Sequence, residues 1–191
     1  MQSTNEDIVK EIRIHGRGGQ GSVVLAELFA RAAWEDGKFS QAFPFLGGGG
    51  ERRGKPIQAF ARIDDRFIRL RSRVHHPDYV IIQDYTLLKE IDALAGLKEG
   101  GKVFVNTERS LSSPERKDIT WIEIPASKIA MEVMGRPLMN AALLGAFSKI
   151  AREISLESVE KAILKKFHGS VGRQNVEIAR TAYQYLGRDL N

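Results

Sequence analysis

The chain has 191 residues, of which 42% are hydrophobic and 28% charged, and it contains no cysteine. Its length predicts one domain spanning residues 1–191, because a chain of this size can bury roughly 70% of its unfolded surface. The missing cysteines exclude disulfides, cysteinyl zinc sites and iron–sulfur clusters held by thiolates of this chain. The four histidines form no HExxH or HxH pattern, so we expect no metal site.

The excess of positive charge is concentrated in one stretch of the chain. The net charge is +5, from 29 basic and 24 acidic residues. Residues 51–73 contain eight of the basic residues and three of the acidic ones, so this stretch carries the whole excess. Such a local patch suggests a phosphate-bearing ligand or an acidic partner surface.

Nothing at the N-terminus resembles a signal peptide. Its first seven residues are polar and slightly acidic, and no run approaches the ~20 apolar residues that cross a bilayer. We therefore expect a cytoplasmic protein without membrane association.

The first part of the chain predicts a strand, a glycine-rich turn, a helix and a second strand. Residues 8–15 (IVKEIRIH) alternate like a strand and run into the turn Gly16-Arg17-Gly18-Gly19-Gln20-Gly21. Residues 22–34 place apolar side chains on one helical stripe, and Gly37 stands where a helix commonly ends. Residues 38–43 can form the second strand. This order is a Rossmann-like opening.

Further strands follow a glycine-rich loop at residues 45–56. Residues 57–63 and 66–70 predict two strands joined at Asp64-Asp65 by a tight antiparallel hairpin. Buried parallel strands are expected at residues 79–83 and 102–105, with a helix capped by Thr86 between them.

The rest of the chain predicts one more strand and several helices. The strand covers residues 119–124, and the helices cover residues 126–134, 139–150, 155–167, where Ser155 is the cap, and 171–186. We therefore predict a single α/β domain with a mostly parallel sheet flanked by helices and one antiparallel hairpin.

The glycine turn fits the pattern GxGxxG between a strand and a helix. Glycines there allow a tight turn and let backbone N–H groups at a helix N-terminus approach an anion. A closely packed strand–helix turn without a ligand would give the same pattern. NAD binding would also need an acidic residue at the end of the second strand. That strand ends in Ala42-Phe43-Pro44, with Asp36 before it, so the sequence argues against NAD.

Several motifs occur together along most of the chain. The turn GRGGQG is followed by QAFPF, by a glycine-rich loop ending in ERRGKP, and by AFARI. YVIIQD, KVFVN and NAALLGA (residues 140–146) come next, and Phe167 and Asn175 lie in the tail. From about residue 12 to residue 186, this combination resembles the gamma subunit of the 2-oxoacid:ferredoxin oxidoreductases, such as those for pyruvate and 2-oxoisovalerate.

The resemblance implies an enzyme of several subunits. Oxidative decarboxylation of a 2-oxoacid with coenzyme A as co-substrate would yield an acyl-CoA, CO2 and reduced ferredoxin. Thiamine diphosphate and Mg would lie on alpha and beta subunits, and iron–sulfur clusters on a delta subunit, with no cofactor on this chain. Alpha, beta and delta subunits and ferredoxin are thus the expected partners, and the isolated chain is expected to be inactive.

The candidate cofactor-binding residues lie in the glycine turn and in the loop after the second strand. They are Gly16, Gly18, Gly19, Gln20, Gly21, Arg52 and Arg53; we assign no catalytic or metal-binding residue. The loop contains four consecutive glycines, residues 47–50, where family members often have one, which leaves its geometry open. Glu51, Arg52 and Arg53 either form a solvated loop or reach a partner subunit, where the guanidinium groups would clamp a carboxylate or phosphate.

Five other polar residues have expected roles. Arg69, Arg71 and Arg73 would share one face of a strand, either as a solvated sheet face or as a platform for coenzyme A phosphates or acidic ferredoxin. Gln20 is expected to tie down the glycine turn. Asn140 is expected to find backbone partners at the start of an apolar helix, because an unpaired buried amide costs ~1–3 kcal/mol.

The main prediction is therefore a gamma subunit that contributes to assembly and to the coenzyme A entrance of the active site. A stand-alone Rossmann-like nucleotide-binding protein is the alternative, supported by the glycine turn alone. Residues 51–73 could also suggest a nucleic-acid-binding module, but they lack the regularly spaced aromatic residues of single-strand binders. We expect no nucleic-acid partner.

Overall fold

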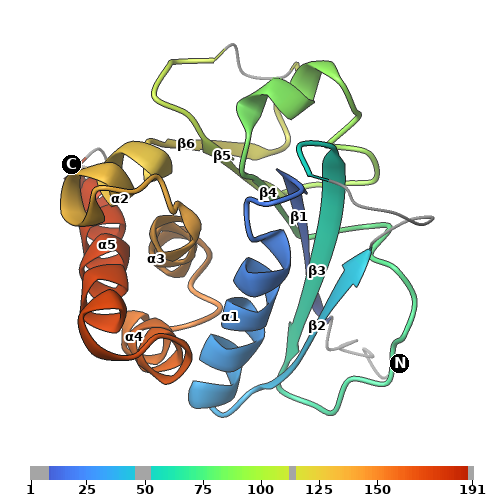
Figure 1. The fold of residues 1–191 in the computed structure, drawn as a ribbon. Helices are drawn as coiled ribbons and strands as arrows, with labels where there is room; N and C mark the ends of the chain where they lie inside the picture. The colour runs from blue at the N-terminus through green and yellow to red at the C-terminus, as the bar shows by residue number, and fades with distance from the viewer. Residues whose placement is uncertain (1–8, 46–52, 112–114, 189–191) are drawn as a thin grey trace.

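The computed structural model describes residues 9–45, 53–111 and 115–188. Within these ranges, six strands form one sheet in the order β2-β3-β1-β4-β5-β6 (Figure 1). The strands are β1 (Lys10–Arg17), β2 (Phe39–Phe45), β3 (Pro56–Asp64), β4 (Tyr79–Ile82), β5 (Lys102–Asn106) and β6 (Thr120–Ile124). The helices are α1 (Ser22–Glu35), α2 (Ala126–Met134), α3 (Asn140–Ala151), α4 (Leu156–Lys166) and α5 (Gly169–Arg188), with a 3-10 helix at Tyr85–Lys89.

The sheet is mostly parallel, as predicted. β1, β4, β5 and β6 are parallel neighbours. β3 lies between β1 and β2 and is antiparallel to both, with Ala61 opposite Ile12 on one side and Ala42 on the other. The strand–helix–strand opening is therefore present, but β3 is inserted between its two strands.

The predicted hairpin at Asp64-Asp65 is wrong. β3 ends at Asp64, and residues 66–70 form no strand. Both edges of β3 are already paired, so no edge is left for a strand that follows it. The backbone of this segment is bonded to side chains instead: Gln41 donates to the carbonyl of Ile68, and Arg62 to that of Ser72.

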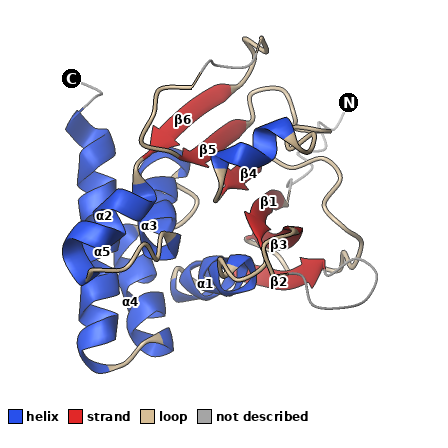
Figure 2. Ribbon diagram, turned by 45° about the horizontal axis from the view of Figure 1, so that its top comes forward, coloured by secondary structure: helices blue, strands red, loops and turns tan. Residues whose placement is uncertain are grey.

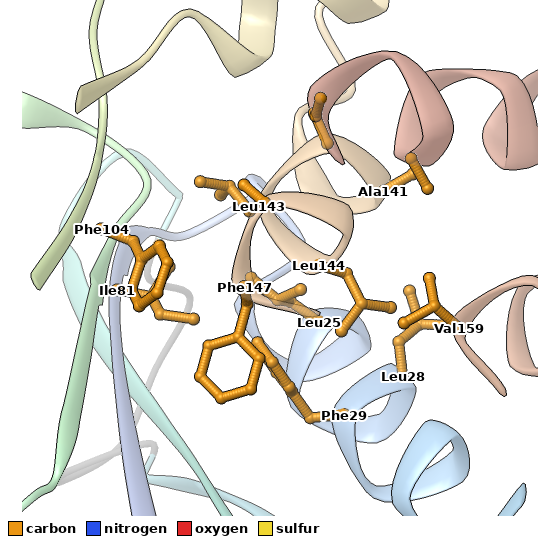
Figure 3. Packing of buried hydrophobic residues seen from close by; sticks show 14 of the residues in the cluster. Leu25, Leu28, Phe29, Ile81, Phe104, Ala141, Leu143, Leu144, Phe147 and Val159 are labelled. Carbon is orange, nitrogen blue, oxygen red and sulfur yellow. The ribbon is translucent and has the colours of Figure 1, made fainter. Parts of the chain in front are cut away.

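The five α-helices of the described residues gather on one side of the sheet, as Figure 2 shows. The core lies between them and the sheet. Phe147 of α3 stands at its centre, with its ring 4.7 Å from that of Phe29 on α1 and 5.4 Å from that of Phe104 on β5 (Figure 3). A smaller apolar cluster, which includes Val80 and Leu97, covers the other face of β4 and β5.

Several helix boundaries follow the local signals that predicted them. Gly37, with φ of 76°, follows α1 as predicted, and Ser155 caps α4 by accepting from the N–H of Ser158 at 3.1 Å. The helix predicted after residue 86 is a single 3-10 segment, and its cap is Asp84, which accepts from the N–H of Thr86. Among the described residues, no helix is both long and apolar enough to span a bilayer.

Candidate functional site

The carboxyl ends of the parallel strands meet at one edge of the sheet. The glycine turn follows β1, Gln83 and Asp84 follow β4, and Asn106 ends β5. From β1 the chain crosses through α1 to the β2 side, whereas β4 and β5 lie on the opposite side of β1. In open α/β sheets, ligands bind outside the carboxyl ends of strands where the strand order changes direction.

The glycine turn has the tight geometry that its residues predict. Gly19 and Gly21 have φ of 98° and 77°, a region in which other L-residues are strained. Gly16 has no room for a side chain, because a Cβ atom there would lie 2.1 Å from Oε1 of Gln83. Oε1 of Gln20 accepts from the N–H of Arg17 at 2.7 Å, so this side chain ties the turn down as predicted.

The turn presents the N-terminus of α1. Its N-cap is Gly21, so no side chain caps the first turn, and that turn contains no acidic residue. The unpaired N–H groups at the start of such a helix, together with the helix dipole, favour an anion. Gly19 is exposed, and a Cβ atom placed on it would meet nothing within 4 Å. The turn is therefore accessible to a ligand.

A buried amide network holds the turn against the neighbouring elements. The hydroxyl of Ser22 donates to Oε1 of Gln83 at 2.5 Å. Nε2 of Gln83 donates to Oδ1 of Asn140 at 2.7 Å and to the carbonyl of Gln20 at 3.2 Å. Nδ2 of Asn140 donates to the carbonyl of Gly21 at 3.0 Å, so Asn140 has one backbone partner and one side-chain partner.

Backbone hydrogen bonds join the glycine turn to the segment before β3. The N–H of Gly18 donates to the carbonyl of Lys55 at 2.9 Å, and the N–H of Gly54 donates to the carbonyl of Gly18 at 3.0 Å. Gly18 and Arg53 form a parallel bridge. The two sequence motifs of the resemblance, GRGGQG and ERRG, are therefore in direct contact.

Arg17 connects this junction to the segment after β4. Its Nε lies 2.8 Å from Oδ2 of Asp84, and its guanidinium also pairs with Glu90. The same group donates to the hydroxyl of Thr86 at 2.7 Å and to the carbonyl of Gly54 at 3.2 Å. Arg17 and its two carboxylate partners together carry a net charge of −1, and the arginine side chain holds three segments together.

The ion pairs of Arg17 keep the acidic residues around it charged. Partial burial acts to raise the pKa of Asp84, but hydrogen bonds donated by Thr86 and Arg17 outweigh it and leave that pKa below its ordinary value. The hydrogen bond from Arg17 likewise lowers the pKa of Glu90. The ion pairs of Arg17 with Asp84 and Glu90 therefore persist well below neutral pH.

A cavity of about 410 Å³ lies beside the turn at the carboxyl edge. Its walls are mostly polar and come from the ends of β1, β4 and β5 and the starts of α2 and α3. They include Gln20, Gln83, Asp84, Asn106, Ser127 and Arg109. Asn106 is fixed there by accepting from the N–H of Ser127 at 3.0 Å and by donating to the carbonyl of Gln83 at 2.9 Å.

The structure brings most of the predicted site residues together. Gly16, Gly18, Gly19, Gln20 and Gly21 form the turn, and Arg53 is exposed beside Gly18. Arg52 lies outside the described residues, as do residues 46–51 of the loop predicted at residues 45–56.

One predicted group of arginines is arranged differently, and three residues that line the cavity were not predicted. Arg69, Arg71 and Arg73 are exposed but do not share the face of a strand, because their segment is not a strand. The sequence analysis did not single out Gln83, Asn106 or Arg109 as site residues. The first two were detectable as polar residues at the ends of apolar strands.

The chain is similar to known proteins over most of its length. Residues 11–185 match the family model described as pyruvate ferredoxin/flavodoxin oxidoreductase. The chain is 49% identical over 176 residues to "Pyruvate synthase subunit PorC" of Methanocaldococcus jannaschii, covering 92% of this chain and 96% of the relative. It is 46% identical over 178 residues to "Pyruvate/ketoisovalerate oxidoreductases common subunit gamma" of Thermococcus litoralis, covering 91% and 95%.

A solved structure shows the same fold. The pyruvate oxidoreductase subunit PORC of Thermotoga maritima superposes with a TM-score of 0.77 at 35% identity, covering 92% of this chain and 96% of that one. The fold, the joined glycine motifs and these relatives lead to one conclusion: the chain belongs to the pyruvate ferredoxin/flavodoxin oxidoreductase family.

Proposed function

We propose that this chain is the gamma subunit of a 2-oxoacid:ferredoxin oxidoreductase and that it contributes the glycine turn to the coenzyme A entrance of the active site. The enzyme converts a 2-oxoacid, coenzyme A and oxidised ferredoxin into an acyl-CoA, CO2 and reduced ferredoxin. Alpha, beta and delta subunits supply thiamine diphosphate, Mg and the iron–sulfur clusters. The alternative of a stand-alone nucleotide-binding protein is not favoured, because relatives that match over most of their length are named as subunits.

The observation that carries this proposal is the contact between the glycine turn and the segment containing Arg53. An uncapped helix N-terminus and an exposed arginine lie side by side there. Both favour the phosphate groups of a ligand such as coenzyme A. Arg17 adds no net positive charge to this site, because with the charged Asp84 and Glu90 it forms a cluster of net charge −1.

The cavity beside the turn suits a ligand with several hydrogen-bonding groups. The amides of Gln83 and Asn106 in its polar wall are bonded within the protein and shape the cavity, while the exposed Glu108 and Arg109 add one carboxylate and one cation. The role of this chain in such an enzyme is to bind and orient, since no general base or nucleophile is assigned to it. Catalysis then takes place in the assembled enzyme.

The test uses the complex rather than the chain alone. The chain is co-expressed with the larger subunits, one of which carries an affinity tag, and the purified complex is assayed with a panel of 2-oxoacids, coenzyme A and a viologen acceptor. We expect activity in the complex and none in the isolated chain. Recovery of the chain without companions, or turnover by the chain alone, would overturn the proposal.

The coenzyme A role is tested by Arg53→Ala in the same complex. We expect the KM for coenzyme A to rise about tenfold or more, as for a charged contact in a desolvated site, while the KM for the 2-oxoacid stays within twofold. Arg173→Ala, an exposed arginine on α5, is the matched control. Equal KM values for coenzyme A in the two variants would show that Arg53 does not contribute to coenzyme A binding.

A further inference from the structure

Several exposed aromatic and arginine residues lie near the start of β2, the edge strand whose place in the sheet Figure 1 shows. We call this surface the aromatic–arginine surface; it consists of Trp34, Phe39, Phe67, Arg69, Leu70 and Arg71. Trp34 and Phe67 are 66% and 70% exposed, which is unusual for such large apolar groups. The rings of Phe39 and Phe67 meet edge to face at 5.9 Å, so the surface is continuous across two segments.

Side chains of β2 and β3 fix the backbone that carries the arginines. Arg62 on β3 is fully buried and pairs with Glu11 at 2.8 Å. Its guanidinium donates to the carbonyl of Ser72 at 2.7 Å, while Nε2 of Gln41 donates to the carbonyl of Ile68 at 2.9 Å. The segment is thus anchored on both sides of Arg69 and Arg71, whose side chains are exposed.

The composition of this surface is that of a protein interface. Arginine and aromatic residues are enriched in interfaces, and a contiguous exposed apolar patch marks a contact site. Residues 66–73 contain four arginines and no acidic residue. A backbone that is already fixed loses less conformational entropy when it binds.

We propose that the aromatic–arginine surface docks against an acidic face of another subunit of the same oxidoreductase. This inference rests on the proposed function, because it needs an assembly of several subunits. The partner face presents carboxylates to Arg69 and Arg71 and an apolar patch to Trp34, Phe39 and Phe67. The candidate site beside the glycine turn is separate from this surface, since none of these residues lines its cavity.

The apolar part of the surface favours a permanent subunit over a mobile electron carrier. Contacts with electron carriers are small and transient, whereas permanent interfaces are larger and more hydrophobic. A small ligand is also a poor fit, because Trp34 and Phe39 line a hollow of about 170 Å³ only.

The experiment measures how much of this chain stays with the tagged larger subunits after co-expression. The double variant Arg69→Glu/Arg71→Glu is compared with wild type at low and high salt. We expect recovery to fall about tenfold, since like charges then face the acidic surface. Arg69→Lys/Arg71→Lys keeps the charge and should restore most of the recovery. Phe67→Ser should lower recovery at every salt concentration.

The control double variant is Arg136→Glu/Arg173→Glu, which makes the same charge change at exposed sites outside the surface. It should be recovered like wild type, and all isolated variants should melt within about 2 °C of wild type, because surface changes cost little stability. Wild type that fails to co-purify contradicts the proposed function itself.

Three results would overturn the docking proposal alone. The first is full recovery of Arg69→Glu/Arg71→Glu. The second is intact assembly with a raised KM for ferredoxin, which would assign the surface to the electron carrier. The third is a wild-type homodimer in solution that the charge reversal dissociates, which would assign it to a second copy of this chain.

Discussion

The side-chain amide of Gln83 donates to Oδ1 of Asn140 at 2.7 Å and thereby joins the end of β4 to the start of α3. Asn140 in turn donates to the carbonyl of Gly21, at the start of α1. One asparagine therefore connects three of the elements that surround the candidate site, β4, α3 and α1. The amide pair thus adds polar contacts between elements that also pack together in the hydrophobic core.

Asn140→Ala should destabilise the chain by about 1–2 kcal/mol, because it removes two hydrogen bonds from a partly buried network. The cost stays moderate, since the carbonyl of Gly21 keeps the N–H of Leu25 as a partner. Urea unfolding at neutral pH measures the change. Gln184→Ala, at an exposed position on α5, is the control and should stay within about 0.5 kcal/mol of wild type. Equal midpoints for both variants would contradict a structural role for the network.

A Gly145→Ala substitution should be among the most damaging single-methyl changes in the core. A Cβ atom at this position of α3 would lie 2.1 Å from the carbonyl oxygen of Ala179 on α5. Because backbone atoms block it, the two helices must separate, at a cost of about 1–3 kcal/mol. Gly187→Ala is the matched control. Its Cβ would meet the end of Lys149 at 3.6 Å, and a helical alanine should then be neutral or stabilising by about 0.5 kcal/mol.

The buried His15 should make stability fall in acid. Burial, and then the charge of Arg13, whose Nε donates to Nε2 of His15 at 3.1 Å, lower the pKa of His15 to about 3. In the unfolded chain this pKa is about 6.5, so between these values the unfolded state binds a proton that the folded state does not. Stability is therefore lost as the pH falls, by about 1.4 kcal/mol per pH unit from this residue.

Guanidinium unfolding at several pH values from 7 to 4 tests this slope. His15→Gln keeps an acceptor for Arg13 but does not titrate, so its free energy of unfolding should fall less steeply with decreasing pH than that of wild type. His168→Gln, which replaces an exposed histidine, should retain the wild-type slope. Parallel curves for wild type and His15→Gln would show that His15 does not account for acid sensitivity.

The parts of the fold that the sequence predicted are those controlled by neighbouring residues. The glycines of residues 16–21 fix the turn between β1 and α1, and Gly37 and Ser155 mark helix ends where local backbone chemistry requires them. The sequence predicted the turn and Arg53 as candidate binding residues, and the backbone bonds between Gly18, Gly54 and Lys55 bring their two segments together.

The parts that it missed depend on pairing across long distances. Asp64-Asp65 has the composition of a hairpin turn, but β3 is paired on both edges by β1 and β2, which no local pattern shows. From the sequence, Arg62 looks like one more exposed charge in a basic stretch. In the structure it is buried and bonded to Glu11 and Ser72. Sequence periodicity does not distinguish a buried, fully bonded arginine from a solvated one.

The joined glycine turn and Arg53 segment should loosen when Arg17 is replaced. Arg17→Met removes the hydrogen bonds to Asp84, Glu90 and the carbonyl of Gly54 but keeps the aliphatic stem. The amides of Gly18 and Gly54, which bond across the junction, should then exchange with deuterium about tenfold faster, because local opening becomes easier. Arg116→Met is the control: it removes a surface pair with Asp118 and should leave both amides unchanged. Unaltered exchange in Arg17→Met would mean that the backbone bonds alone hold the junction, and that Arg17 only balances the charge of its two carboxylates.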